Sequence, residues 1–205
     1  MEVETLVRKK ILEKTLRIGL VGESKAKADY ITRPTEYKGI IQYLYSDVSS
    51  DEGMKIMHVT DEVLSISGMT VDEAFDIALF NTSQDSVLMH SSQVPIFFGN
   101  GEGSELEISE IMKESSIPLY IITNRSANRG ASAILNKTLI KRFAKDIGAE
   151  KLLAIPSTIH EFILVPITDE GAEDIDFFKS IVQDVNTNVV CPDEVLSNEA
   201  YIITA

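Results

Sequence analysis

Cysteine and tryptophan are nearly absent from this sequence, which has one cysteine, no tryptophan, 11 glycines and 6 prolines in 205 residues. Cys191 has no second cysteine to pair with, so an internal disulfide and a cysteine-built zinc site are both excluded. The low glycine and proline content excludes a collagen-like chain. Hydrophobic residues make up 44% of the chain. That share is ordinary for a globular domain, so intrinsic disorder is excluded as well.

Long apolar runs are also missing. The longest, such as residues 95–98 and 162–167, fall far below the roughly 20 residues that a membrane-spanning helix needs. The first residues, Met1–Glu4, are acidic and contain no apolar signal region. We therefore expect a cytoplasmic protein with no membrane partner.

Basic side chains are in the minority, with 19 lysines and arginines against 32 aspartates and glutamates and a net charge of −13. This balance argues against a nucleic-acid backbone or an anionic membrane as the main partner. The excess is concentrated in residues 49–116, which hold 2 basic and 13 acidic side chains, whereas residues 1–48 carry +2 and residues 117–205 carry −4. This acidic region is either a solvated face that keeps the protein soluble or a docking face for a basic partner.

Apolar periodicity and end signals predict the secondary structure. Helices are predicted over residues 3–16, 60–67, 70–79, 104–115, 136–147, 173–185 and 192–196. Strands are predicted over residues 38–45, 54–59, 94–98, 118–123, 152–155, 162–167 and 201–203. Gly19 and Gly22 are expected to end the first helix, and Thr70 with Glu73 forms a capping box. Together these elements predict a single α+β domain over residues 1–205, with a mixed, partly antiparallel sheet flanked by helices.

Reactive side chains are densest in residues 156–161, between two strands that we expect to pair antiparallel. Ser157, His160 and Glu161 bring together a hydroxyl, an imidazole and a carboxylate, the groups needed for nucleophilic catalysis. Adjacent side chains of a strand point to opposite faces, which makes Glu161 a poor orienting group for His160, and no G-x-S-x-G motif is present. The alternative is that Ser157 and His160 bond the backbone of the connection.

A polar loop with two arginines follows the strand predicted over residues 118–123. We expect that strand to be of the parallel type, and the C-terminal ends of such strands commonly carry ligand sites. Asn124, Arg125 and Arg129 could there bind a carboxylate or a phosphate. The alternative is a solvent-exposed loop without a ligand.

The glycine run of residues 99–103 does not predict a nucleotide site. It lacks the G-x-G-x-x-G spacing and the Lys-Ser/Thr pair of a phosphate-binding loop. Its neighbours Glu102, Glu105 and Glu107 would repel a phosphate at the start of the following helix. The histidines His58 and His90 have no metal-ligand spacing, so we expect neither a cofactor nor a metal ion.

The second half of the chain contains a succession of short motifs. They are Thr123-Asn124, Gly130-Ala131, Pro156-Ser157-Thr158-Ile159-His160-Glu161, Val185-Asn186, and Glu194-Val195-Leu196-Ser197 followed by Tyr201. This succession resembles a family of uncharacterised proteins of gut-dwelling anaerobic bacteria, a domain of unknown function. The family pattern reads L-T-N, G-A, P-S-S-I-H-E, V-N and E-V-L-S. The resemblance is strongest over residues 117–203 and weak over the first 50 residues, and Thr158 replaces the second serine of the pattern.

The resemblance implies a shared fold of α and β character, an N-terminal segment that members have and this sequence lacks, and no assigned activity. The positions that match the family motifs are Asn124, Ser157, His160, Glu161 and Asn186. Whether these positions are catalytic, ligand-binding or architectural is open at this point.

We therefore expect a soluble, non-enzymatic interaction or regulatory module. The acidic region of residues 49–116 would dock an unknown protein partner, and self-association into a homo-oligomer is left open. Two alternatives remain. One is a hydrolase-like enzyme that uses Ser157 and His160, and the other is a small-anion binder that uses Arg125 and Arg129.

Overall fold

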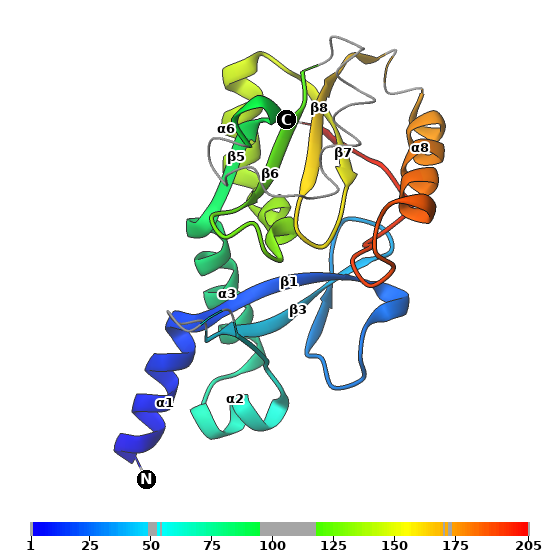
Figure 1. The fold of residues 1–205 in the computed structure, drawn as a ribbon. Helices are drawn as coiled ribbons and strands as arrows, with labels where there is room; N and C mark the ends of the chain where they lie inside the picture. Colours follow the sequence, from blue (N-terminus) through cyan, green and yellow to red (C-terminus); the bar gives the residue numbers. More distant parts are fainter. Residues whose placement is uncertain are drawn as a thin grey trace. The chain divides into compact units, whose positions relative to one another are not determined.

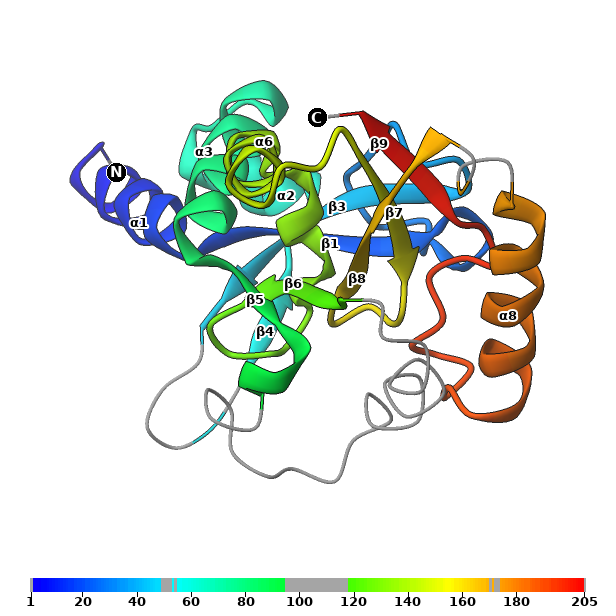
Figure 2. The ribbon, with the colours of Figure 1, turned by 90° about the horizontal axis from the view of Figure 1, so that it is seen from above.

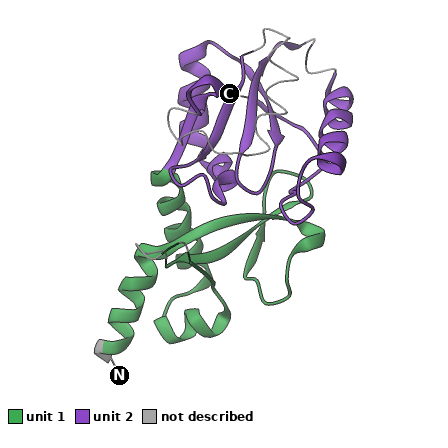
Figure 3. Ribbon diagram, in the orientation of Figure 1, with its two compact units in different colours: residues 1–85 green, residues 86–205 purple. Residues whose placement is uncertain are grey.

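The computed structural model describes residues 2–48, 53, 55–94, 118–169, 171 and 174–204 (Figure 1). Over these residues the chain forms helices and two antiparallel sheets, which confirms the predicted α+β class. It divides into two compact units, residues 1–85 (unit 1) and residues 86–205 (unit 2), coloured separately in Figure 3. This division concerns compactness, so the single domain stays a prediction and each unit is described by itself.

Unit 1 is a small antiparallel sheet with three helices. Its elements are α1 (Glu2–Thr15), β1 (Leu16–Gly22), η1 (Glu23–Lys25), β2 (Thr32–Pro34), β3 (Ile40–Asp47), β4 (Ile56–His58), α2 (Asp61–Ser67) and α3 (Val71–Asp85). β3 is the central strand, and β1, β2 and β4 all pair with it antiparallel. The predicted strand pair over residues 38–45 and 54–59 is thereby confirmed.

The first helix ends one residue earlier than predicted, because strand β1 begins directly after it. The helix ends at Thr15, and Gly19 and Gly22 lie inside β1 rather than at a helix end. Gly19 stands opposite Tyr43 in the register, and a Cβ at Gly19 would lie 2.4 Å from the Cζ of that tyrosine. Glycine is therefore needed at position 19, because the Tyr43 ring leaves no room for a side chain there.

Polar side chains of α3 cover the edge of β1 that does not face β3. The backbone N–H of Ile18 donates to Thr82 Oγ1 at 3.0 Å, and Asn81 Nδ2 donates to the carbonyl of Leu16 at 3.0 Å. An edge strand with unpaired main-chain groups is a template for unwanted pairing. In unit 1 the hydrogen bonds from α3 remove that hazard.

The helices of unit 1 begin where the capping residues predict. The Glu73 N–H donates to Thr70 Oγ1 at 3.2 Å, and the Thr70 N–H donates to Glu73 Oε2 at 2.8 Å, which confirms the capping box. These bonds to Thr70, with the nearby charge of Lys9, lower the pKa of Glu73 below its ordinary value. Gly68 ends α2 in the left-handed conformation at φ 65°, as is usual for a glycine after a helix.

Unit 2 is built on a five-stranded sheet. Its elements are β5 (Ser86–His90), η2 (Ser91–Gln93), β6 (Tyr120–Asn124), η3 (Gly130–Leu135), α6 (Lys137–Ile147), β7 (Lys151–Pro156), β8 (Phe162–Ile167), α8 (Ile175–Asn188) and β9 (Tyr201–Thr204). The strand order is β5-β6-β8-β7-β9, and every neighbouring pair is antiparallel. The strand over residues 120–124 is thus antiparallel to both neighbours, and its predicted parallel type is wrong.

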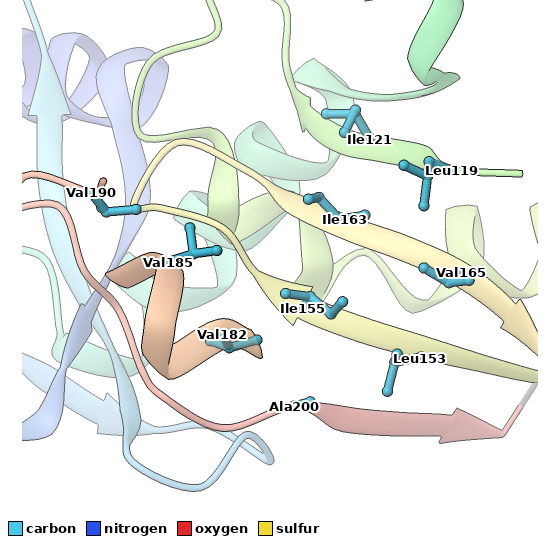
Figure 4. Packing of buried hydrophobic residues seen from close by; sticks show 10 residues of the cluster. All are labelled: Leu119, Ile121, Leu153, Ile155, Ile163, Val165, Val182, Val185, Val190 and Ala200. Carbon is cyan, nitrogen blue, oxygen red and sulfur yellow. The ribbon is translucent and has the colours of Figure 1, made fainter. Parts of the chain in front are cut away.

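Both faces of this sheet are covered. Figures 1 and 2 place α6 and α8 on opposite sides of β7 and β8. On the α8 side, Val182 and Val185 pack against Leu153, Ile155 and Ile163 of the sheet (Figure 4). The central strand β8 is buried on both faces, which explains why its sequence is a continuous apolar run rather than an alternating one.

The remaining comparisons between prediction and structure concern short segments. The helix predicted over residues 192–196 is wrong: residues 192–194 form a turn, in which the Glu194 N–H donates to the Cys191 carbonyl at 2.8 Å. Strand β5 was not predicted, because polar residues precede and follow its short apolar centre. The strand predicted over residues 94–98, the glycine run and the helix over residues 104–115 fall outside the described residues, apart from Val94.

Candidate functional site

The connection from β7 to β8 folds around a buried carboxylate. Thr158 and Glu161 are both only 3% exposed, and Thr158 Oγ1 donates to Glu161 Oε1 at 3.0 Å. The same hydroxyl oxygen accepts the backbone N–H of His160 at 3.0 Å. Because burying a polar group costs free energy unless it is hydrogen-bonded, the Thr158 hydroxyl stabilises this connection.

Both ring nitrogens of His160 face a partner. Nδ1 accepts the backbone N–H of Arg129 at 3.1 Å, and Nε2 lies 3.4 Å from Glu194 Oε1. Since an N–H donor points at Nδ1, the proton of the neutral imidazole is assigned to Nε2, where it faces the Glu194 carboxylate. The nitrogen lone pair that a general base would use is therefore engaged by the main chain.

The backbone of His160 is held as tightly as its ring. Its carbonyl accepts Thr123 Oγ1 at 2.8 Å, and the neighbouring Ile159 carbonyl accepts the Ala131 N–H at 3.3 Å. A Cβ at Gly130 would lie 2.2 Å from Thr123 Oγ1 and 2.7 Å from the His160 carbonyl oxygen. Only glycine allows the start of η3 to approach this closely. We call this assembly the His160 clasp, comprising Thr123, residues 129–131, residues 158–161 and Glu194.

Ser157 lies apart from the clasp, although it is next to Thr158 in the sequence. It is 6% exposed and lines a cavity of about 20 Å³ together with Asn186 and apolar side chains of β7 and α8. Within the part of the chain that the structure describes, its hydroxyl makes no hydrogen bond, to His160 or to any other residue. A cavity of this size holds one water molecule rather than a substrate.

Asn186 makes hydrogen bonds to the segment that leads into β9. Its Nδ2 donates to the Ser197 carbonyl at 3.0 Å and to Asn198 Oδ1 at 2.9 Å. Ser197 in turn accepts the Tyr201 hydroxyl at 3.0 Å. The family-like residues Asn186, Ser197 and Tyr201 thus form a second group of contacts that fixes the chain before β9.

The loop after β6 is organised by Asn124. Its Nδ2 donates to the Asn128 carbonyl at 2.7 Å, and its Oδ1 accepts the Asn128 N–H at 3.2 Å and the Ser126 hydroxyl at 3.0 Å. Both polar atoms of the amide therefore make hydrogen bonds within their own loop. Arg125 is exposed, whereas Arg129 is half-buried with φ at +51° and gives its N–H to the clasp. Anion binding by the two arginines stays a prediction.

The candidate residues therefore divide into three groups. His160, Glu161 and Arg129 belong to the clasp, Ser157 and Asn186 share the small cavity, and Asn124 closes the turn that carries the exposed Arg125. Sequence reasoning did not identify Thr123, Gly130 or Glu194 as partners of His160. The available signal was the family-like succession of motifs, since each of its parts supplies a residue to the clasp or to the group around Asn186.

Replacing Thr158 with valine is expected to lower the free energy of unfolding by about 2–3 kcal/mol, because the buried Glu161 loses a donor and the His160 N–H loses an acceptor. Denaturant unfolding followed by circular dichroism measures this loss. Thr158→Ser keeps the hydroxyl, and serine is also the residue of the resembled pattern, so this control is expected to stay within about 1 kcal/mol of the parent. Equal losses for the two variants would contradict a role for the hydroxyl.

Unit 1 carries a larger hollow, of about 340 Å³, between α1, α2, β3 and β4. We call it the unit 1 groove. Its apolar lining consists of Ile11, Leu12, Val48, Met57, Val63 and Ile66. Four of these side chains remain substantially exposed: Ile11 at 57%, Ile66 at 43%, Val48 at 42% and Met57 at 41%.

The polar side chains of the unit 1 groove are satisfied within the unit. Arg8 pairs with Glu4 at 2.6 Å, Ser46 Oγ donates to Thr15 Oγ1 at 2.7 Å, and Ser67 Oγ donates to the Leu64 carbonyl at 2.8 Å. What the groove offers a ligand is therefore mainly apolar contact.

Comparison with known proteins gives one match. The sequence model of a family described as "Family of unknown function (DUF5688)" matches residues 39–204. The matched segment contains the whole His160 clasp but begins after α1, which forms one wall of the unit 1 groove. No curated protein matches the chain, and no solved structure does. Within the described ranges, none of the helices is long and apolar enough to cross a membrane.

Proposed function

Since the chain belongs to this family of unknown function, DUF5688, its role has to be inferred from its own residues, and we propose that it is a non-enzymatic protein-interaction module. The observation that carries the proposal is the unit 1 groove, where four large apolar side chains stay exposed around a hollow of about 340 Å³. Exposed apolar patches of this kind on soluble proteins mark interaction sites.

The His160 clasp supports a binding role over hydrolysis. A serine nucleophile needs a base within about 3 Å whose lone pair points at it. Here the lone pair of His160 Nδ1 accepts the Arg129 N–H, and the Ser157 hydroxyl lies in the cavity that it shares with Asn186. The hydrolase alternative would require His160 to leave both of its partners, so we do not favour it.

The groove favours the apolar face of a partner helix. An amphipathic helix presents large side chains at intervals of three and four residues, and such helices commonly bind in apolar grooves between other elements. Each polar side chain of the groove already has a partner within unit 1, and Arg8 is the one charged side chain among its lining residues. We propose a protein partner that inserts apolar side chains between α1 and α2.

The proposal also covers the kind of cell and the compartment in which the protein works. We propose a cytoplasmic protein, because a single exposed cysteine suits a reducing compartment, and a bacterial one, on the family resemblance of the sequence alone. We also keep the acidic region of residues 49–116 as a second docking face. Its described carboxylates include Asp72, which pairs with Arg33, and Glu73, which caps α3; Glu102, Glu105, Glu107, Glu110 and Glu114 lie outside the described residues.

Site-specific photo-crosslinking tests the groove. A benzoylphenylalanine residue at Met57 in the full chain, expressed in its source cell, is expected to give a discrete cross-linked protein band. The same substitution at Phe80 is the control, since Phe80 is 63% exposed in the same unit but does not line the groove. Adding Ile66→Lys is expected to abolish the band from Met57, because a charge would then stand in the apolar lining.

Two outcomes would contradict the proposal. One is a band of equal strength from Phe80, which would mean non-specific capture. The other is a band from Met57 that Ile66→Lys leaves unchanged, which would mean that the partner does not enter the groove.

A further inference from the structure

Strand β9 forms one edge of the unit 2 sheet. It pairs antiparallel with β7, from Tyr201 opposite Ala154 to Thr204 opposite Lys151. Within the described part of the chain, no strand pairs with its other side. In an antiparallel strand, alternate residues direct their N–H and C=O groups to opposite sides. The outer side of β9 therefore offers a row of main-chain donors and acceptors.

Within the described residues, the short strand β9 carries no charged residue or proline that would block pairing. Natural edge strands are commonly protected by lysine, proline, a bulge or a covering element. The sequence from Tyr201 to Thr204 is Tyr-Ile-Ile-Thr, which contains no charge, proline or glycine and favours the strand conformation. In unit 1, by contrast, side chains of α3 bond the exposed edge of β1.

An apolar side chain stands at the same edge. Ile202 is opposite Leu153 in the register and so lies on the sheet face that α8 covers. Leu153 is 1% exposed, whereas Ile202 is 38% exposed. Helix α8 therefore buries the inner strands but leaves Ile202 at the edge partly exposed.

The charged residues beside β9 are already paired within unit 2. Lys179 lies 3.2 Å from Glu199, and that carboxylate raises the pKa of Lys179 above its ordinary value. Lys151, opposite Thr204, lies 2.5 Å from Asp169, whose pKa it lowers. The edge is thus close to neutral in a chain of net charge −13.

We propose that β9 pairs antiparallel with β9 of a second copy of this chain, joining two five-stranded sheets across a two-fold axis. A two-fold axis brings the same strand against itself, and an uncharged strand can do this without placing like charges opposite each other. Antiparallel pairing also continues the pattern of the whole sheet. The new strand pair satisfies the outer main-chain groups and covers Ile202.

The oligomeric state of the full chain tests this pairing. Analytical ultracentrifugation at about 100 μM protein is expected to give twice the mass of one chain. Ile202→Lys places a charge beside its own symmetry copy and is expected to weaken association at least about tenfold. The matched control is Phe177→Lys, because Phe177 is 63% exposed in the same unit and belongs to α8 rather than to β9. This control is expected to remain dimeric.

Salt provides an independent readout. Because two copies of net charge −13 repel each other, screening by added salt is expected to tighten a dimer held by a neutral edge.

Thr204→Lys, at an exposed position of the same strand, repeats the test if Ile202→Lys fails to fold. A wild-type monomer, a dimer that survives both strand variants, or a dimer that Phe177→Lys dissociates would each overturn the proposal.

Discussion

Substituting Gly130 with alanine is expected to lower the free energy of unfolding of unit 2 by about 3 kcal/mol, the upper part of the range for overpacked sites. The added Cβ would lie 2.5 Å from the backbone nitrogen of Asn124 and 2.7 Å from the His160 carbonyl oxygen. Neither group is the end of a flexible side chain, so β6 and the β7–β8 connection must move apart. That movement breaks the hydrogen bonds from Thr123 and Arg129 to His160.

Gly148→Ala is the matched control for this prediction. Gly148 follows α6 with φ at +69°, and a Cβ there would meet nothing within 4 Å. Alanine at this position strains the backbone alone, which costs about 1–2 kcal/mol. Chemical denaturation followed by circular dichroism compares the two variants. A loss at Gly130 no larger than the loss at Gly148 would contradict the clasp as the cause.

Substituting Gly19 with alanine is the second prediction of large effect, with an expected loss of about 2–3 kcal/mol in unit 1. The added methyl group would lie 2.4–2.6 Å from three atoms of the Tyr43 side chain. Tyr43 is only 1% exposed, and its ring stacks on Tyr30 with centroids 4.6 Å apart. The ring cannot swing away without losing this packing, so strand β1 has to shift.

A double-mutant cycle isolates the contact between Gly19 and Tyr43. In a Tyr43→Leu background the ring is gone, and Gly19→Ala is expected to cost less than about 1 kcal/mol. The coupling free energy is then about 2 kcal/mol, within the range for residues in direct contact. A coupling close to zero would mean that the glycine is required for another reason.

Local sequence signals predicted the elements that depend on neighbouring residues. The capping box at Thr70 and Glu73, the glycine after α6 and the apolar run of β8 each act over a few positions, and the structure contains all three. Strand β1 escaped prediction because Arg17 and Gly19 interrupt its apolar residues. Its stability comes from pairing with β3 and from hydrogen bonds to α3, which are distant in the sequence.

Sequence periodicity could not predict the His160 clasp for the same reason. The bond from Thr123 to the His160 carbonyl spans 37 positions, and the contact between His160 and Glu194 spans 34. Residue types alone drew attention to Ser157 and His160 as a reactive pair, whereas the fold gives these neighbours separate environments. The family-like motifs drew attention to His160 and Asn186, but the partners of these residues required the three-dimensional structure.

The two compact units have a consequence for synthesis of the protein on the ribosome. Unit 1 is one uninterrupted stretch, residues 1–85, so all of its strands and helices emerge before the sheet of unit 2 begins. Unit 2 is different, because β7 is synthesised before its pairing partner β9, whose Thr204 pairs with Lys151. At an elongation rate of about 5–20 residues per second, the edge of β7 stays open for seconds. During that interval, β9 of a neighbouring nascent chain can take the vacant place and produce a strand-swapped pair of molecules.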